Sequence, residues 1–518
     1  MARRFDAVSY SRLPLSGADG NSKEGVGSLC DNEGGGSVSG EDDLIVNDVM
    51  KYTDETSTNK EEDDEKTYTV EEAVEAIGFG RFQLIVYFVG GTITAADALE
   101  MMLLSVLSPV VRCEWNLSEW KVAFITTVVF LGMGISSPLI GLVGDKHGRK
   151  VALLIVTLSI GYFGFLATFS PTYVWMLLLR GLVGCGMGGS TQGSSLLAEY
   201  LPSKYRAKLM LSTQIFWATG VTIEVLMASV VIPTLGWRWL MVFSSVPVLV
   251  AAAFLLCVPE STRYLVAAGR TKEAAEILKR GAVINKSILP PGRLLEPPVQ
   301  KQLGRPLDLF SREYLRSTLQ LWLLWFGTAF SYYGMVLVSS QLLTVNSAKE
   351  NNCKCAYLTS DDYHTMIFST LGEFMCIPLN VLLIDTVGRK LTGTINLSVT
   401  GLFFALMQLP VSRGVLTFFM FAVRGFSAAT FSWVYLYSLE VYPTSIRTFG
   451  MGTASMWARV GAMVTPFVAQ VLLAHSVSMA LWAYAVVCLL CAITAFSMPI
   501  ETRGRAMPQF VEMEMEVK

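Results

Sequence analysis

The chain has 518 residues, of which 52% are hydrophobic and only 16% are charged. Soluble domains carry roughly 25% charged residues, so a soluble protein of this composition would expose too much apolar surface to water. The formal net charge of -2 provides no basic field of the kind that attracts nucleic acids. The composition therefore indicates a membrane protein and argues against a nucleic-acid-binding one.

Residues 1–69 differ in composition from the rest of the chain. They are rich in Gly, Ser, Asp and Glu, with runs such as EDD at 41–43 and EEDDE at 61–65. Such a segment cannot bury enough apolar surface to offset the entropy lost on ordering. We therefore predict a disordered acidic tail, to which trafficking adaptors could bind. The next stretch, VEEAVEAIGFGRF at 70–82, predicts a short interfacial helix.

About twelve apolar stretches follow, each long enough to cross a hydrocarbon core of ~30 Å at ~1.5 Å per residue. The predicted spans are 83–107, 121–144, 150–169, 172–196, 208–231 and 237–258, then 316–340, 364–386, 391–410, 414–437, 449–473 and 476–498. A basic, proline-containing gap separates six spans from six. The predicted domains are a tail at 1–69, a six-helix bundle at 70–258, a central loop at 259–315, a second six-helix bundle at 316–498 and a tail at 499–518.

The distribution of Lys and Arg predicts the orientation in the membrane. Basic clusters all fall on one side, whereas the opposite loops carry few, and the clusters are KHGRK at 146–150, SKYRAK at 203–208, the central loop, GRK at 388–390 and TRGR at 502–505. We therefore expect both termini and the central loop to be cytosolic.

This orientation makes the first non-cytosolic loop informative. Asn116, in the sequon Asn116-Leu117-Ser118, is a predicted glycosylation site there. Cys113, Cys353 and Cys355 also fall on this side, where they could form a disulfide or remain as thiols.

Four pieces of the first half recur in the second half in the same order. Asp145 and Asp385 are 240 residues apart, Glu199 and Glu440 are 241 apart, PESTR at 259 and PIETR at 499 are 240 apart, and Arg180 and Arg424 are 244 apart. A parallel repeat of this kind is a transporter architecture. The sequence therefore predicts an all-α membrane protein with twelve transmembrane helices in two pseudo-symmetric six-helix bundles.

Several of these motifs carry a family resemblance. GLVGDKHGRK at 141–150 resembles the signature loop of the major facilitator superfamily, RGLVGCGMGG at 180–189 its helix 4 motif, and PESTRYL at 259–265 its helix 6 ending. More narrowly, ADALEMM, GWRW and YSLEVYPTSIR are similar to segments of the synaptic vesicle 2-related proteins, with organic cation and anion transporters as more distant relatives. The resemblance runs from about residue 70 to 505. It implies the major facilitator fold and a place in a synaptic or other cytoplasmic vesicle membrane, or in the plasma membrane.

The repeated loop motifs are candidates for conformational gating. Gly141 and Gly148 permit close helix approach and a tight turn, and Asp145 can cap a neighbouring helix or pair with an arginine. A charge network at these motifs could latch the two bundles together in one state, although topogenic charges and turn residues are the alternative. The candidates are Gly141, Asp145, Gly148, Arg149, Arg180, Glu199 and Arg206, with Asp385, Gly388, Arg389, Arg424, Glu440 and Arg447.

Other motifs argue against enzyme chemistry. Gly184, Gly186 and Gly189 satisfy GxGxxG, but no strand precedes them, so we expect small residues that let the fourth and fifth spans touch. The chain has no GxxxxGK[ST], HExxH or GxSxG motif, and its three histidines are scattered. We therefore expect no enzyme active site, metal site or cofactor, and an ion gradient, exchange or downhill flow as the energy source.

Five charges at mid-depth break the repeat and are candidates for contact with substrate or a coupling ion. They are Asp97, Glu100, Glu224, Glu373 and Arg459. Asp97 and Glu100, in ADALEMM at 96–102, lie about 60° apart around a helix and can face one cavity. Because two neighbouring carboxylates repel each other, one of them is expected to hold a proton. The alternative is a static salt bridge with Arg459 or Arg180.

Helix 7 and helix 11 supply the other candidates for substrate binding. Arg459, opposed by acids from three other helices, indicates a zwitterionic or carboxylate-bearing substrate. Tyr332, Tyr333 and Gln341 could stack on the substrate or hydrogen-bond to it, with helix packing as the alternative for each tyrosine.

The predicted function is secondary active transport of a small organic ion by alternating access, with proton coupling through Asp97 and Glu100 as the preferred mechanism. The alternative is a transport-inactive vesicle membrane protein that acts as a scaffold, receptor or binding module. The expected partners are the organic ion, protons, the lipid bilayer and adaptors at the N-terminal tail. No nucleic acid partner is expected.

Overall fold

The computed structural model describes residues 67–295, 306–350, 357–443 and 446–503, apart from a few side chains. The predicted acidic tail up to residue 66, together with Cys353 and Cys355, lies outside the described residues. The chain divides into two compact units. In the smaller unit, β1 (Thr67–Tyr68) pairs in parallel with β2 (Arg293–Leu294), a strand pair that the sequence did not predict.

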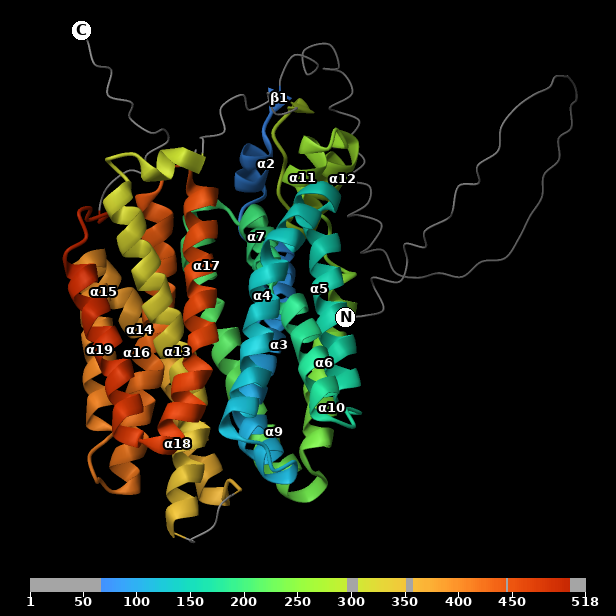
Figure 1. Ribbon diagram of the computed structural model, residues 1–518. Helices are drawn as coiled ribbons and strands as arrows, with labels where there is room; N and C mark the ends of the chain where they lie inside the picture. Colours follow the sequence, from blue (N-terminus) through green and yellow to red (C-terminus); the bar gives the residue numbers. More distant parts are fainter. Residues whose placement is uncertain (1–66, 296–305, 351–356, 444–445, 504–518) are drawn as a thin grey trace, which may run out of the picture. The chain divides into compact units, whose positions relative to one another are not determined.

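Each of the twelve predicted spans is helical, and all of them belong to the larger unit (Figure 1). The first bundle consists of α3 (Arg81–Glu114), α4 (Glu119–His147), α5 (Arg149–Ala167), α6 (Tyr173–Met187) with α7 (Thr191–Tyr200), α8 (Ser203–Ser212) with α9 (Gln214–Leu235), and α10 (Trp237–Leu255). The second bundle consists of α13 (Leu315–Glu350), α14 (Ser360–Val387), α15 (Arg389–Leu406), α16 (Arg413–Val441), α17 (Arg447–Pro466) with the π-helix η4 (Phe467–Leu472) and α18 (Leu473–His475), and α19 (Val477–Phe496).

Ten of the helical segments that the structure describes are long and apolar enough to cross a membrane. The two remaining spans fall short for local reasons. Helix α6 has only 15 residues before a turn at 188–190 separates it from α7, and α15 has 18 residues that begin with Arg389 and Lys390. The all-α prediction is confirmed.

The segments before the first span and between the bundles contain helices. Helix α2 (Val70–Ile77) begins at a capping box of Thr69 and Glu72, and the predicted gap contains α11 (Thr262–Ala267), α12 (Thr271–Asn285) and the short 3-10 helix η3 (Pro306–Phe310). The apolar face of α2 packs against α12, so protein covers the face that an interfacial helix would turn to lipid. Asn285 fixes this corner, because its side chain accepts a hydrogen bond from the Phe82 N–H at 3.0 Å.

The hydrophobic clusters of the two bundles are joined at one end and separate at the other. We call the end next to Gly148 and Gly388 the motif end, and the end next to Asn116 the sequon end. At the sequon end a single cluster joins both bundles, with Val106 of α3 and Val338 of α13 among its fully buried members. At the motif end each bundle has a cluster of its own, built only from residues of that bundle.

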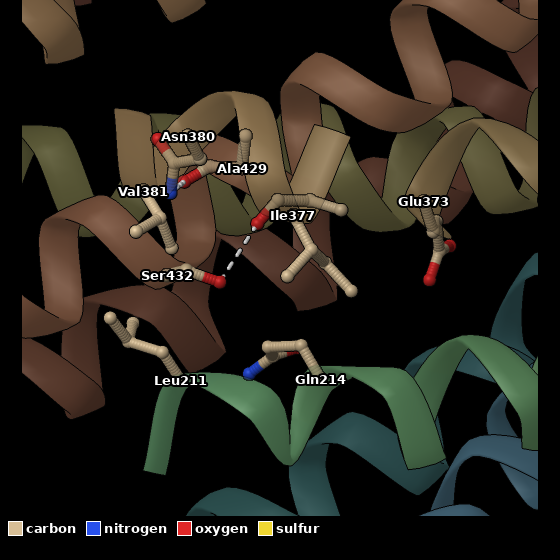
Figure 2. A pocket seen from close by; sticks show the side chains of 9 residues that line it. Leu211, Gln214, Glu373, Ile377, Asn380, Val381, Ala429 and Ser432 are labelled. Atoms are coloured by element: carbon tan, nitrogen blue, oxygen red, sulfur yellow. Dashed lines mark hydrogen bonds between the residues drawn. The ribbon is translucent and has the colours of Figure 1, made fainter. Parts of the chain in front are cut away.

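Polar contacts between the bundles follow the same division. Towards the sequon end, Ser105 lies 3.0 Å from Ser340, and Gln470 in the π-helix donates to Ser108 at 3.1 Å and to Thr126 at 3.4 Å. Towards the motif end, a pocket opens between the α8–α9 segment and helices α14 and α16 (Figure 2). Its lining is Leu211, Gln214, Glu373, Ile377, Asn380, Val381, Ala428, Ala429 and Ser432. Among the described residues, the bundles are therefore packed together towards the sequon end and leave a small pocket between them towards the motif end.

Glycines allow helix contacts that differ from the predicted ones. A Cβ at Gly184 would lie 2.1 Å from the Val129 carbonyl oxygen of α4, and one at Gly186 would lie 3.1 Å from the Ile160 nitrogen of α5. The GxGxxG glycines thus pack the fourth span against the second and third spans, so the predicted contact with the fifth span is wrong. The close helix approach predicted at Gly141 is also wrong, because a Cβ there would meet no atom within 4 Å.

Substitution of Gly184 by Ala should destabilise the protein, because a backbone carbonyl occupies the position of the added methyl group. Overpacking of this kind costs about 1–3 kcal/mol, so the melting temperature in detergent should fall clearly. Gly90→Ala is the matched control, since nothing lies within 4 Å of a Cβ at that helical position. Equal melting temperatures of the two variants would contradict the packing described here.

A cysteine pair at Ser105 and Ser340 should cross-link under mild oxidation, because the two hydroxyls are 3.0 Å apart. The cross-link should hold the two bundles together at the sequon end, and reduction should release it, which gel mobility after proteolysis between the bundles would report. Cysteines at Gln214 and Ser432, on opposite sides of the pocket at the motif end, should not form a disulfide in this conformation. Cross-linking of the second pair but not the first would reverse the assignment of open and closed ends.

Candidate functional site

The first bundle contains a buried ion pair at mid-depth. Arg180 of α6 donates from Nη1 to Glu100 Oε2 of α3 at 2.8 Å, and both side chains are only 1% exposed. Glu100 therefore takes the salt-bridge arrangement with Arg180, the alternative that the sequence left open. The pair is not saturated, because Glu100 Oε1 and Arg180 Nε and Nη2 have no hydrogen-bond partner among the described residues.

Glu224 of α9 lies near this pair but does not join it. Its side chain is fully buried, and both of its oxygens lie within 3.0 Å of the Ser244 hydroxyl of α10. Glu100 and Arg180 are within electrostatic range, yet within the described ranges no Lys or Arg nitrogen approaches Glu224 to 4.0 Å. Glu100 is thus compensated by an arginine, whereas Glu224 has only a hydroxyl partner among the described residues.

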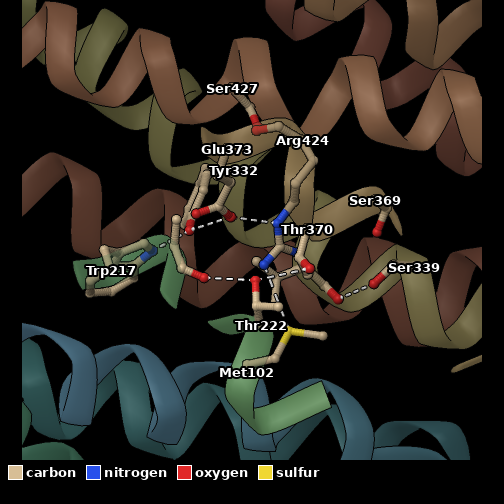
Figure 3. Close-up of polar contacts among 12 residues, drawn as sticks. Met102, Trp217, Thr222, Tyr332, Ser339, Ser369, Thr370, Glu373, Arg424 and Ser427 are labelled. Carbon is tan, nitrogen blue, oxygen red and sulfur yellow. Dashed lines mark hydrogen bonds and ion pairs between the residues drawn. The ribbon is translucent and has the colours of Figure 1, made fainter. Parts of the chain in front are cut away.

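The second bundle contains a corresponding ion pair with an aromatic partner. Arg424 of α16 donates from Nε to Glu373 of α14 at 2.6 Å, and both are buried. The Tyr332 hydroxyl donates to the same Glu373 oxygen at 3.1 Å and accepts from Trp217 Nε1 of the first bundle at 2.5 Å (Figure 3). Arg424 also reaches the first bundle, with Nη2 3.7 Å from the Met102 sulfur. Mid-depth polar groups therefore connect the two bundles.

The two ion pairs combine repeated and unrepeated residues. Arg180 and Arg424 occupy corresponding places in the two halves. Their acids do not correspond, because Glu100 lies on the first span of its bundle and Glu373 on the second span of the other. The sequence assigned the repeated charges to conformational change and the unrepeated ones to ligands. In the structure each ion pair joins a repeated arginine to an unrepeated glutamate.

Asp97 and Arg459, like Glu224, form no ion pair with a described residue. Asp97, on α3, is 6% exposed and interacts with the Ser190 hydroxyl, whereas the buried Nε of Arg459, on α17, has no hydrogen-bond partner there. Tyr333 of α13 is within electrostatic range of both, and its ring centroid lies 4.9 Å from that of Phe130. An acid of the first bundle and an arginine of the second thus lie within electrostatic range of one aromatic side chain.

The remaining helix 7 candidate is also buried at the interface between the bundles. Gln341 is 3% exposed, and its Nε2 has no hydrogen-bond partner among the residues described. It lies next to Ser340, which contacts Ser105 of the first bundle. Gln341 therefore offers an unused donor on the sequon side of Tyr333.

At the motif end, the repeated motifs form one network in each bundle. Arg149 pairs with Asp145 at 2.6 Å and lies 4.0 Å from Glu199, which accepts a hydrogen bond from Ser261. In the second bundle, Arg389 binds both oxygens of Glu440 at 3.0 Å, and Thr502 donates to Glu440 at 2.5 Å. None of the ion pairs found among the described residues crosses between the bundles at this end.

The other motif residues have local roles. Gly148 and Gly388 adopt positive φ values of 104° and 95°, which confirms the predicted tight turns. Arg206 Nε donates to the Leu201 carbonyl and Arg447 Nε to the Tyr442 carbonyl, each at 3.1 Å. Asp385 differs from its repeat partner Asp145, because it forms no ion pair with the described residues.

Two glutamates of these networks were not recognised as site residues from the sequence. Glu260 accepts the Lys150 N–H at 2.9 Å, and Glu501 accepts the N–H groups of Arg389 at 2.9 Å and Lys390 at 3.0 Å, so each caps the helix after a glycine turn. Burial opposes the charge of Glu501, but these backbone hydrogen bonds hold its pKa below the ordinary glutamate value. The available signal was that PESTR and PIETR each contain one glutamate, at the second position in PESTR and at the third in PIETR.

The sequon end carries the predicted modification and disulfide positions. Asn116 is exposed, with a left-handed φ of 48°, in the turn between α3 and α4. Glycosylation there remains a prediction. Cys113 is disulfide-bonded, and every other cysteine in the described ranges is free.

Comparisons with known proteins agree with this architecture. A family model described as "Sugar (and other) transporter" matches residues 48–513. The human "Putative transporter SVOPL" is 44% identical over 462 residues, which cover 86% of this chain and 94% of that protein. The rat "Synaptic vesicle 2-related protein" is 44% identical over 454 residues, which cover 86% of this chain and 83% of that protein.

A solved structure shares the fold at low sequence identity. It is described as the partially occluded inward open conformation of the xylose transporter XylE from E. coli. The TM-score is 0.62 at 16% identity, and the match covers 82% of this chain and 100% of the other.

The two acids of ADALEMM should respond differently to neutralisation. Glu100→Gln leaves the buried Arg180 without its counter-charge, which costs about 3–5 kcal/mol, so the melting temperature should fall. Asp97→Asn breaks no ion pair with a described residue and should leave the melting temperature nearly unchanged. The double variant Glu100→Gln with Arg180→Gln should recover most of the loss. A double variant less stable than Glu100→Gln alone would contradict this pairing.

Proposed function

The chain belongs to the family of sugar (and other) transporters and is similar to synaptic vesicle 2-related proteins, and we propose that it transports a small organic ion. The mechanism that we propose is alternating access. It is a multi-pass membrane protein with the major facilitator fold. The observation that carries the proposal is that Asp97 and Arg459, which form no ion pair with a described residue, both lie within electrostatic range of Tyr333.

The energetics of burial support a ligand at these two charges. A charge near the centre of a bilayer costs roughly 2.5–3.5 kcal/mol on insertion scales, and charges retained there usually face a cavity or a partner. Glu100 and Glu373 have arginine partners, whereas Asp97 and Arg459 form no ion pair with a described residue. An organic ion with complementary charge would supply the missing partner, and Tyr333 would contribute an aromatic face.

The asymmetry between the two ends supports alternating access. The bundles share apolar packing at the sequon end and are separate at the motif end, where the pocket reaches Glu373. With the orientation that Lys and Arg predict, this is an inward-facing conformation. In the opposite conformation, the sequon end would open and the networks of the motif end would approach each other as the proposed latch.

Proton coupling is the energy source that we favour. Asp97, Glu100 and Glu224 lie on two adjacent helices of the first bundle, with Arg180 near the latter two. Neighbouring buried carboxyl groups cannot all be ionised at low cost, so such a cluster can exchange a proton during a transport cycle. We further propose residence in a vesicle membrane or the plasma membrane, with cytosolic termini and adaptor binding at the N-terminal tail.

Purified protein in proteoliposomes should take up an organic cation, anion or zwitterion, and an imposed pH gradient should increase the uptake. Asp97→Asn and Arg459→Gln should each lower uptake by at least about tenfold, equivalent to about 1.4 kcal/mol of lost interaction. Glu273→Gln is the control, because Glu273 is exposed and pairs only with the neighbouring Arg270. Full uptake in both site variants, or ligand binding without flux in the wild type, would refute the proposal. The second result would favour a scaffold, receptor or binding module.

A further inference from the structure

Glu224 has a hydrogen-bond environment that suits the neutral acid and not the carboxylate. Its side chain is fully buried, and Ser244 is the one hydrogen-bond partner found for it in the described part of the chain. A carboxylate can only accept hydrogen bonds, whereas a serine hydroxyl carries one hydrogen to donate. Ser244 is therefore the single source from which a Glu224 carboxylate could receive a hydrogen bond.

The hydroxyl of Ser244 has another acceptor for that hydrogen. Its Oγ lies 2.8 Å from the carbonyl oxygen of Leu240, one helical turn earlier in α10. If Ser244 donates to Leu240, its lone pairs face both oxygens of Glu224, at 2.8 and 3.0 Å. Glu224 and Ser244 can then form a hydrogen bond only if Glu224 carries a hydrogen and donates it to Ser244. An ionised Glu224 would leave buried acceptor oxygens without donors, which is costly away from water.

The charges around Glu224 point in the same direction. Helix α9 packs against α3, α10 and α14. The charged groups on these helices at this depth are Asp97 and Glu100 on α3 and Glu373 on α14, all acidic, while α10 carries only Arg238 at its sequon end. Arg180 of α6 is the cation within electrostatic range, and its Nη1 is bound to Glu100. Ionisation of Glu224 would therefore add a second carboxylate beside one guanidinium.

We propose that Glu224 is the group of the first bundle that holds the coupling proton in this conformation, an inference that rests on the proposed function. One proton adds to a Glu224 oxygen from water on one side of the membrane and later leaves to water on the other side. The free Nε and Nη2 of Arg180 are the donors that could stabilise the carboxylate after the proton has left. Glu100 then acts as the permanent partner of Arg180.

Infrared spectroscopy of the purified full-length protein at neutral pH tests this assignment without any substrate. The wild type should show the carbonyl absorption of a protonated carboxyl group, and Glu224→Gln should lose it. Glu373→Gln is the matched control, because Glu373 is ion-paired and should not contribute to this band. Ser244→Ala should shift the band by removing the acceptor of the Glu224 hydrogen bond, whereas Ser245→Ala should not, since Ser245 donates to Val242. These serine variants keep the test open if Glu224→Gln folds poorly.

The outcomes separate this inference from the proposed function. A band that Glu224→Gln leaves unchanged, or no such band in the wild type, overturns the proton assignment even if transport is observed. A band assigned to Glu224 in a protein that takes up no ion supports the proton site and refutes the transport proposal. In proteoliposomes, Glu224→Gln should keep substrate exchange and lose accumulation driven by a pH gradient. Accumulation at the wild-type level would refute the coupling role.

Discussion

The requirement that buried charge be compensated governs the middle of this protein. Each bundle holds an arginine at corresponding depth, and each arginine is neutralised by a glutamate on a neighbouring helix, Glu100 in one case and Glu373 in the other. Removal of one member of such a pair costs several kcal/mol, so the pairs limit how the helices can pack. Asp97, Arg459 and Glu224 differ from these pairs, because none of the three forms an ion pair with a described residue.

The same constraint separates the middle of the protein from its motif end. There the repeated arginines and glutamates are partly exposed, and each network stays within its own bundle. Glu260 and Glu501 cap the helices that follow the glycine turns, so the motifs first of all stiffen the ends of their own bundle. Rigid bundles with few contacts between them at one end are the parts that a rocking motion needs.

Sequence reasoning predicted the repeat, the helices and the depth of the charges, because these depend on spacing and hydropathy. It could not predict that Arg180 binds Glu100 rather than Asp97, since both acids lie within one turn of the same helix. The role of Ser244 was also out of reach, because a serine in an apolar helix carries no signal of its partner. Contacts between segments far apart in the chain are not specified by a single sequence. They determine the pairing of β1 with β2, the packing of α12 against α2 and the residues that surround Gly184.

The polar seam at the sequon end consists only of neutral groups, namely the hydroxyls of Ser105, Ser108, Thr126 and Ser340 and the amide of Gln470. Each such hydrogen bond contributes only about 0.5–1.5 kcal/mol, so water can replace these hydrogen bonds with a small loss of free energy when the two bundles separate. Because the groups carry no net charge, their separation does no work against the membrane potential, which acts with about 2.3 kcal/mol per elementary charge at 100 mV. Voltage would then have no direct effect on the separation of the two bundles at the sequon end.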